Sequence, residues 1–419
     1  MAVHLEADNR AEFARLFERV GRELLLDTPA LVSLDRSELL ASASRTTGLS
    51  DFGGDDFLEP LDVLLASLDR ESHLTLLGRI LVRSELLNLL QNRLRIADLV
   101  KREPGIREQR IERPIFIVGL PRSGTTILHE LMALDPRLRA PLTWEARFPC
   151  PPATAETYAT DSRIESADRI FQFWIDLVPE FQTMTEMGGR LPCECIQLTT
   201  HSFRSEEFLG RQQTPSYGAW LATADMAPAY AYHRLMLQLF AWSLPTERWM
   251  LKAPSHMGAL PALLAEYPDA CIVQTHRDPL QSMASTGSLL AAHAWMRASE
   301  VDVPLIKLGF AGEGMAARIA SVLAVRDRHP RAADQFHDVR FSDLMSRPVE
   351  TLRNVYEKFS IGFGKPEEDR IRAYLAAKPR GKYGRHEYRI EDLGVDVAEE
   401  RARFSAYQQR FAVESEIEV

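Results

Sequence analysis

The stretch Pro114–Thr126 reads PIFIVGLPRSGTT, and the fold can be inferred from it. Its apolar run Ile115–Val118 is typical of a short strand buried on both faces. A loop bounded by Gly119 and Gly124 comes next, and Ile127–Leu134 then predicts a helix. A strand, a glycine loop and a helix in this order open a parallel α/β sheet. The backbone N–H groups of such a loop and the positive end of the helix favour a bound anion.

Later segments continue the same alternation of strands and helices. Buried strands are expected at Trp249–Leu251, Ala270–Thr275 and Asp338–Phe341, with helices at Gly258–Glu266 and Leu280–His293. We therefore predict an α/β fold in which a P-loop-like parallel sheet is flanked by helices.

Helical sequence precedes and interrupts this pattern. Apolar residues recur at helical spacing in Ala11–Leu26 and Ser84–Arg102, and an aromatic-rich helical stretch separates the first two predicted long strands. We expect most of those aromatics in the core and some around an apolar pocket. The expected boundaries are 1–112 for an N-terminal helical region, 113–400 for the α/β domain with a helical insertion at about 155–243, and 401–419 for a C-terminal helix and tail.

Composition excludes some classes of function. The chain of 419 residues has a formal net charge of −9, so it lacks the excess of Lys and Arg that general nucleic-acid binding needs. The N-terminus lacks the layout of a signal peptide, and no run of apolar residues approaches the roughly 20 that a membrane helix needs. We therefore expect a cytoplasmic protein without a transmembrane segment, and leave peripheral membrane contact open.

The four cysteines give no evidence of a metal site. Cys193 and Cys195 form a lone C-x-C pattern without a second pair, whereas zinc sites need more ligands. Reduced thiols are the expected state in a cytoplasmic protein. We predict no bound metal.

The glycine loop differs at one position from the loops that bind nucleoside triphosphates. The spacing from Gly119 to Gly124 matches the Walker A pattern, but Thr125 stands where that pattern has Lys. A triphosphate with magnesium needs this Lys, whereas a phosphosulfate carries less charge and needs no metal. The loop instead contains Arg122, with hydroxyl groups at Ser123 and Thr126 as well as at Thr125.

Four motifs together resemble the sulfotransferases that use 3′-phosphoadenosine-5′-phosphosulfate (PAPS), and most closely a bacterial branch that also resembles tyrosylprotein sulfotransferases. The resemblance is weaker in Val339–Pro348 and Gly381–Asp396, covers most of the chain after residue 112, and fits the N-terminal helices only loosely. The motifs are Pro114–Thr126 (PIFIVGLPRSGTT), Arg139–Glu145 (RAPLTWE), Trp249–His256 (WMLKAPSH) and His276–Ser285 (HRDPLQSMAS).

The resemblance implies PAPS as the sulfate donor and assigns residues to it. Arg122 would contact the sulfonyl or bridging oxygens, and Lys252 would stabilise the leaving phosphate. Arg277 and Ser285 would hold the 3′-phosphate, which suits the bidentate geometry of Arg. The remaining implied donor contacts are Ser123, Gly124, Thr125 and Thr126 in the loop, Phe341 stacking on adenine, and Lys382 or Arg385 in a segment that lacks the Gly-x-x-Gly-x-Trp ending of the family.

The base that accepts the acceptor's proton has two candidates. Glu145 stands where the tyrosylprotein branch has its catalytic glutamate, and a carboxylate there could take a hydroxyl proton. His256 is the rival, although the cytosolic branch has its histidine two residues after the equivalent of Lys252 rather than four. Glu145 is favoured at about two to one on proton-transfer logic, and His129 is a distant third.

The expected reaction is in-line transfer of a sulfonyl group to a hydroxyl, without metal or covalent intermediate. The acceptor would be a small or lipid-like molecule, with no nucleic acid involved, and a homodimer is left open. Two other classes remain. A nucleotide-dependent kinase would use the loop for ATP, but the loop lacks its Lys. A non-catalytic nucleotide-binding protein would not need Lys252 or Glu145.

Overall fold

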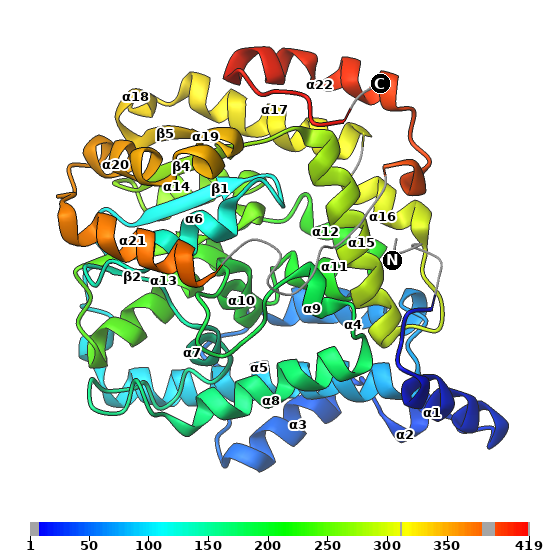
Figure 1. The fold of residues 1–419 in the computed structure, drawn as a ribbon. Helices are drawn as coiled ribbons and strands as arrows, with labels where there is room; N and C mark the ends of the chain where they lie inside the picture. The colour runs from blue at the N-terminus through cyan, green and yellow to red at the C-terminus, as the bar shows by residue number, and fades with distance from the viewer. Residues whose placement is uncertain (1–7, 311, 379–389, 418–419) are drawn as a thin grey trace.

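The structure is a computed structural model that describes residues 8–310, 312–378 and 390–417. A parallel five-stranded sheet of order β2-β3-β1-β4-β5 organises the C-terminal two thirds of the chain (Figure 1). The α/β fold predicted from the sequence is therefore confirmed. The strands are β1 (Ile115–Gly119), β2 (Leu138–Arg139), β3 (Arg248–Lys252), β4 (Cys271–His276) and β5 (Phe336–Arg340).

The position of β1 in the middle of the sheet follows from its sequence. All five of its residues are buried, as expected for a strand covered on both faces. Ile117 pairs with Lys252 on β3 and with Val273 on β4. This register brings the ends of three strands, and the residues that follow them, to the same edge of the sheet. Ligands bind at that edge in open α/β sheets.

The predicted strand boundaries differ from the observed ones by one or two residues. The last predicted strand included Phe341, whereas β5 ends at Arg340 and Phe341 begins α19 (Phe341–Ser346). The benzene ring therefore leaves the sheet at its carboxyl edge and packs on the glycine loop.

Helices cover both faces of the sheet (Figure 1). One core holds α6 with α20 and α21 against one side of the strands, and a larger core holds α13, α14, α15, α17 and α22 against the other. The helices are α6 (Thr125–Met132), α13 (Ala227–Ser243), α14 (Leu260–Glu266), α15 (Pro279–Arg297), α16 (Val303–Phe310), α17 (Gly312–Arg328), α18 (Ala332–Gln335), α20 (Pro348–Lys358), α21 (Lys365–Ala377) and α22 (Val397–Phe411), with short 3-10 turns η3 (Pro254–Met257) and η4 (Glu391–Leu393).

The N-terminal helices form a separate core at the opposite end of the molecule from α22 (Figure 1). Phe203, Phe208, Tyr217 and Leu221 from the insertion complete this core, so the two helical regions stabilise each other. The N-terminal elements are α1 (Glu12–Glu23), α2 (Thr28–Leu31), α3 (Arg36–Thr47), α4 (Leu58–Glu71), α5 (Leu76–Arg102) and η1 (Pro104–Ile106).

Between β2 and β3 the chain forms mostly short helices, whose loops approach the carboxyl edge of the sheet. The insertion expected at about 155–243 contains α8 (Ser162–Leu177), α9 (Phe181–Met184), α10 (Cys195–Thr199), η2 (Thr200–Ser202), α11 (Glu207–Arg211), α12 (Pro215–Leu221) and α13. The short helix α7 (Thr143–Arg147) precedes it and carries Glu145.

One stretch of the described chain differs from the expectation that no apolar run would be long enough for a membrane. By length and composition alone, Val303–Arg328 is long and apolar enough to cross a membrane, with a mean hydropathy of 1.3 in its most apolar window. Lys307 and Glu313 interrupt the stretch, so no continuous apolar run is visible in the sequence. A single stretch of this kind is weak evidence of a membrane span. In the structure it forms α16 and α17, which pack against each other and supply one wall of a cavity described below.

Gly78 allows α5 to approach α15 closely, and this contact joins the N-terminal helices to the α/β domain. A Cβ atom at Gly78 would lie 1.8 Å from the carbonyl oxygen of Arg297. Gly78→Ala should therefore lower the free energy of unfolding by about 3 kcal/mol, measured by urea denaturation. Gly21→Ala in α1 is the control, because its Cβ meets no atom closer than 3.9 Å. That change should instead stabilise the protein by about 0.5–1 kcal/mol. Equal effects of the two substitutions would contradict the close approach.

Candidate functional site

The glycine loop turns sharply between β1 and α6. Gly124 adopts a left-handed conformation (φ 91°) as the N-cap of α6, and Arg122 has a positive φ of 64°. A Cβ atom at Gly124 would lie 2.9 Å from the Phe341 ring, so only glycine lets this ring close on the loop. The first turn of α6, with Thr125 and Thr126, thus faces an open cavity at the edge of the sheet.

Ser123 fixes the loop to the sheet. Its hydroxyl group lies 2.6 Å from both the Leu120 carbonyl oxygen and Thr275 Oγ1, and its side chain is buried. The Thr275 hydroxyl group also donates to the carbonyl oxygen of Val118 at 3.3 Å. The Ser123 hydroxyl is therefore part of the loop's own support in this structure.

Arg277 and Phe341 lie against the outer side of the loop. The guanidinium carbon of Arg277 lies 4.0 Å from the centre of the Phe341 ring, a cation–π geometry. Arg277 Nη1 donates to the carbonyl oxygen of Arg122 at 2.8 Å. The predicted 3′-phosphate ligand thus lies beside the predicted adenine platform, and it also holds the loop.

The side chain of Arg122 extends from the loop to the insertion. Its Nε donates to Ser285 Oγ at 3.1 Å and its Nη2 to the carbonyl oxygen of Met184 at 3.1 Å. Ser285 lies on α15, so the structure brings the two predicted donor ligands into contact with each other. Ser285 is itself buried, and its hydroxyl oxygen holds the Arg122 side chain by accepting this hydrogen bond.

Lys252 ends β3 and points to the other side of the loop. Only 3% of its side chain is exposed, its Nζ forms an ion pair with Glu194, and it lies 3.5 Å from Thr126 Oγ1. Beside it, burial and the positive charge of Lys252 lower the pKa of His129 to about 3. His129 is therefore neutral at physiological pH, and its Nε2 lies 3.3 Å from the carbonyl oxygen of Met250.

These residues surround one cavity of about 710 Å³ with several charged side chains on its wall, called here the donor cavity. Predicted site residues on its wall are Arg122, Gly124, Thr125, Thr126, Lys252, Arg277 and Phe341. Ser123 and Ser285 lie directly behind this wall. Lys382 and Arg385 lie outside the described residues. The predicted residues form the part of this wall that lies at or just after the carboxyl ends of the strands, whereas most of the other wall residues belong to the insertion and to α15.

The two predicted bases lie apart from the centre of the donor cavity. Glu145 is buried and accepts hydrogen bonds from Arg139 at 2.6 Å, from the Leu142 N–H at 2.9 Å and from the Tyr158 hydroxyl at 3.0 Å. Glu145 is not one of the described residues that line the two large cavities. It stays a prediction as the base, and its visible role is to hold the turn that precedes α7.

His256 lies on the wall of a second cavity and is buried. Its Nδ1 lies 2.7 Å from the hydroxyl oxygen of Tyr230, whereas its Nε2 has no hydrogen-bond partner among the described residues. Burial, together with the nearby His233, lowers the pKa of His256 well below its usual value. This imidazole is neutral and can accept a proton only at a high energetic cost, and its role as a base stays a prediction.

A family model described as "Sulfotransferase family" matches residues 114–364, which is more than half of the chain. The chain belongs to the sulfotransferase family. The match begins at the strand before the glycine loop and continues past β5, so it includes the whole described donor cavity except Lys378.

Solved mycobacterial sulfotransferases have the same fold. Sulfotransferase STF9 from Mycobacterium avium has a TM-score of 0.83 and 26% sequence identity, covering 91% of this chain and 98% of its own. Sulfotransferase STF1 from Mycobacterium tuberculosis H37Rv has a TM-score of 0.73 and 30% identity, covering 90% of this chain and 99% of its own. These matches extend over nearly the full length of the sulfotransferase, beyond residues 114–364.

Two curated relatives are named for their substrate. The omega-hydroxy-beta-dihydromenaquinone-9 sulfotransferase Stf3 of Mycobacterium bovis is 26% identical over 301 residues, which cover 67% of this sulfotransferase and 71% of that relative. The protein of the same name from Mycobacterium tuberculosis matches to the same extent.

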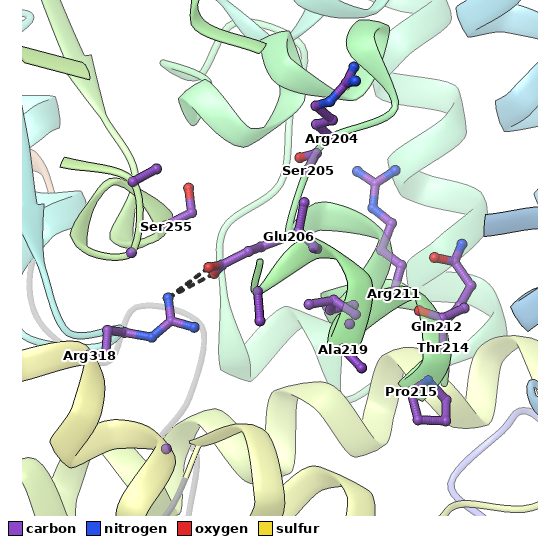
Figure 2. A pocket seen from close by; sticks show the side chains of 18 of the residues that line it. Arg204, Ser205, Glu206, Arg211, Gln212, Thr214, Pro215, Ala219, Ser255 and Arg318 are labelled. Atoms are coloured by element: carbon purple, nitrogen blue, oxygen red, sulfur yellow. Dashed lines mark hydrogen bonds and ion pairs between the residues drawn. The ribbon is translucent and has the colours of Figure 1, made fainter. Parts of the chain in front are cut away.

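The sulfotransferase has a second cavity of about 550 Å³, mainly apolar, called here the apolar cavity (Figure 2). Its wall comes from the insertion, from η3 and α15, and from α16 and α17. Glu206 crosses it to meet Arg318, with 2.9 Å between Glu206 Oε1 and Arg318 Nη1 (Figure 2). Apolar wall residues include Leu209, Leu221, Ala222, Met226, Leu290, Leu305 and Ile306.

The two cavities adjoin each other. Both are lined by Glu206, Gly210, Arg211, Ser255 and Leu290, so the donor cavity and the apolar cavity share part of a wall. The sequence indicated an apolar pocket in the insertion without naming its residues. The contribution of α16 and α17 was missed, because these helices follow the insertion by some 60 residues.

The C-terminal segment lies against the donor cavity. Glu416 accepts two hydrogen bonds of 2.7 Å from Arg277, through Nε and Nη2. Asp278 fixes this segment, because its carboxylate accepts two hydrogen bonds from Arg401 and one of 2.7 Å from the Glu416 N–H. No sequence pattern indicated this contact, since it joins residues 139 positions apart.

Further charged residues of the donor cavity were missed. Lys378 follows α21 and pairs with Glu130 at 2.9 Å and with Glu186. Glu194 pairs with Lys252. Neither residue lies in a motif, and the sequence carries no signal that separates Glu194 from the other charged residues of the insertion. In the described parts of the chain, no group of three or more His, Cys, Asp or Glu residues could hold a metal ion.

Proposed function

We propose that this sulfotransferase uses PAPS as its donor and transfers the sulfonyl group to the hydroxyl group of a lipid-like acceptor. The observation that supports the donor most is the convergence of Arg122, Lys252 and Arg277 on one cavity at the carboxyl edge of a parallel sheet. Cations on both sides of a glycine loop suit an anion that carries charge at two separated ends.

The cavity has the features that such a donor needs. The Phe341 ring lies on the wall of this cavity, held against the loop at Gly124, and it would offer an apolar face to the adenine. Arg277 would bind the 3′-phosphate bidentately, with Phe341 under the adenine. The first turn of α6 and the Thr125 and Thr126 hydroxyls would bind the 5′-phosphate, at the positive end of the helix.

Catalysis would consist of positioning and of charge stabilisation. Lys252 would stabilise the negative charge that develops on the oxygen bridging phosphorus and sulfur. Arg122, held by Ser285 and by the Met184 carbonyl, would orient the sulfonyl oxygens. The buried position of Lys252 strengthens its effect, because water screens its charge poorly there.

The acceptor would enter through the apolar cavity. Its walls suit a long apolar body, and its shared wall with the donor cavity lets a terminal hydroxyl reach the sulfonyl group. The Stf3 relatives are named for a hydroxylated menaquinone derivative, which has this shape of a hydroxyl on a long apolar molecule. A cytoplasmic location stays part of the proposal.

The donor is tested by calorimetric binding of 3′-phosphoadenosine 5′-phosphate (PAP), of adenosine 5′-phosphate and of ATP with magnesium. PAP should bind most tightly, and Arg277→Ala should reduce its advantage over adenosine 5′-phosphate by about 10- to 100-fold, since hydrogen bonds to charged groups contribute about 1.5–3 kcal/mol. Preference for ATP with magnesium would refute the sulfotransferase donor. Unchanged discrimination in Arg277→Ala would refute the 3′-phosphate assignment.

The acceptor route is tested by filling the apolar cavity. Ala219→Trp places an indole on the cavity wall at an exposed position, so folding should tolerate it (Figure 2). Turnover of farnesol, an isoprenoid alcohol, should fall by at least about tenfold, while calorimetric PAP affinity is unchanged. Thr223→Trp is the control, because it adds the same side chain at an exposed position outside the cavity wall. Equal turnover in both variants would mean that the acceptor enters elsewhere.

The contact between Glu416 and Arg277 gives a further test. Under the proposed function the 3′-phosphate and the Glu416 carboxylate bind the same guanidinium, so they compete. Glu416→Gln should therefore tighten PAP binding by up to about fivefold, in keeping with the roughly 0.2–1 kcal/mol of partly exposed ion pairs. Glu414→Gln, an exposed neighbour, removes the same charge without touching Arg277 and should leave the affinity within error. Weaker PAP binding in Glu416→Gln would show that the tail assists the donor instead.

A further inference from the structure

Sulfonyl transfer to an alcohol needs a group that takes the hydroxyl proton. This group has to lie near the reacting sulfur, and therefore near Lys252 under the proposed function. Glu145 lines neither cavity, and its two oxygens accept three hydrogen bonds within its own surroundings. His256 lines the apolar cavity, with Tyr230 on its Nδ1.

Glu194 meets the positional requirement. Its carboxylate lines the donor cavity and forms an ion pair with Lys252 Nζ. Its side chain is 31% exposed against 3% for Lys252, so Glu194 is the more accessible member of this ion pair. Thr126 Oγ1, at the start of α6, lies 3.5 Å from the same ammonium group. A sulfonyl group held between the loop and Lys252 is therefore within reach of Glu194.

The neighbouring cysteines explain how the chain presents this carboxylate. Cys193 and Cys195 are buried in the main core, and Glu194 between them has extended backbone (φ −83°, ψ 145°). Successive side chains of an extended segment point to opposite sides, so two inward thiols place the carboxylate outward. The C-x-C pattern thus acquires a role that involves no metal.

The segment before Glu194 is fixed by the turn that Glu145 holds. Three backbone hydrogen bonds of 2.8–3.0 Å join residues 141–144 to residues 189–193. Glu145 accepts the N–H of Leu142 within this turn, and Leu142 pairs with Pro192 as an isolated bridge. Glu145 is therefore suited to be a positioning residue for Glu194.

The other carboxylates of the described donor-cavity wall pair with cations other than Lys252. Their partners are Lys378 for Glu130 and Glu186, Arg318 for Glu206, and Arg211 for Glu207. Glu194 is thus the carboxylate of this described wall that contacts the cation assigned to the leaving oxygen.

We propose that Glu194 is the general base of the transfer, an inference that rests on the proposed function. Glu194 removes the proton of the acceptor hydroxyl while the acceptor oxygen forms a bond to sulfur. The bond from sulfur to the bridging oxygen breaks, and its electron pair stays on the 5′-phosphate oxygen beside Lys252. The proton ends on the Glu194 carboxylate, so the step needs no further reactant.

The decisive experiment compares acceptors of different acidity in Glu194→Gln. Farnesol carries a proton that must be removed, whereas 4-nitrophenol is largely ionised at slightly alkaline pH and needs no base. Turnover of farnesol should fall by about 10²-fold or more, and turnover of 4-nitrophenol by less than about tenfold. Release of PAP from the donor with water as the acceptor, measured in parallel, should fall as with farnesol.

Three variants provide the comparison. Glu207→Gln removes one charge from the same cavity wall and should change turnover of both acceptors by one common factor. Glu145→Gln should lower the melting temperature and reduce turnover of both acceptors equally. Its carboxylate holds the segment that carries Glu194 and does not accept the proton. His256→Ala tests the second predicted base in the same assay.

Calorimetry separates this inference from the proposed function. Glu194→Gln should bind PAP at least as tightly as the unsubstituted protein, because Lys252 loses its competing carboxylate. Equal loss of turnover with farnesol and 4-nitrophenol, or an acidity-dependent loss in Glu145→Gln or His256→Ala instead, would overturn the assignment of Glu194. Absence of PAP binding in the unsubstituted protein would instead overturn the proposed donor.

Discussion

The gathering of positive charge at one edge of the sheet is the constraint on which the rest of the site depends. Arg122, Lys252 and Arg277 face one cavity, and like charges repel each other more strongly where water screens them less. The folded chain offsets this repulsion from distant parts of the sequence: the insertion supplies Glu194, and the C-terminal segment supplies Glu416. The elements around the sheet are therefore part of the site electrostatically, even where they contribute no predicted motif.

The sequence predicted those parts of the site that are local to a strand. Arg122, Lys252 and Arg277 each follow an apolar run, and parallel pairing of β1, β3 and β4 is enough to bring them together. It failed to predict Glu194 and Glu416, because their places depend on tertiary packing of segments without periodic signals. Glu145 illustrates the same limit from the other side: the motif located the residue, but burial and three hydrogen bonds define what its carboxylate touches. The boundary of β5 moved by one residue because the Phe341 ring packs on Gly124 rather than in the sheet.

The two cavities differ in the chemistry that they suit. Residues at the sheet edge line the donor cavity together with the insertion, and the fixed charges there suit a small anionic molecule. The insertion with α16 and α17 forms the apolar space, whose shape can vary without disturbing the charged edge. Their shared wall, which includes Ser255 and Leu290, is the place where the two substrates would meet. Differences in acceptor between related chains are then expected in the helical segments rather than in the loop.

The buried cysteines have a consequence for the dynamics of this edge. Burial raises the pKa of Cys195 to about 12 and that of Cys193 well above its usual value, so both thiols are inert while the segment around them stays packed. A thiol reagent can modify them only when that segment opens. The rate of alkylation at these two positions would therefore report the free energy of local opening of the segment that carries Glu194, independently of global unfolding.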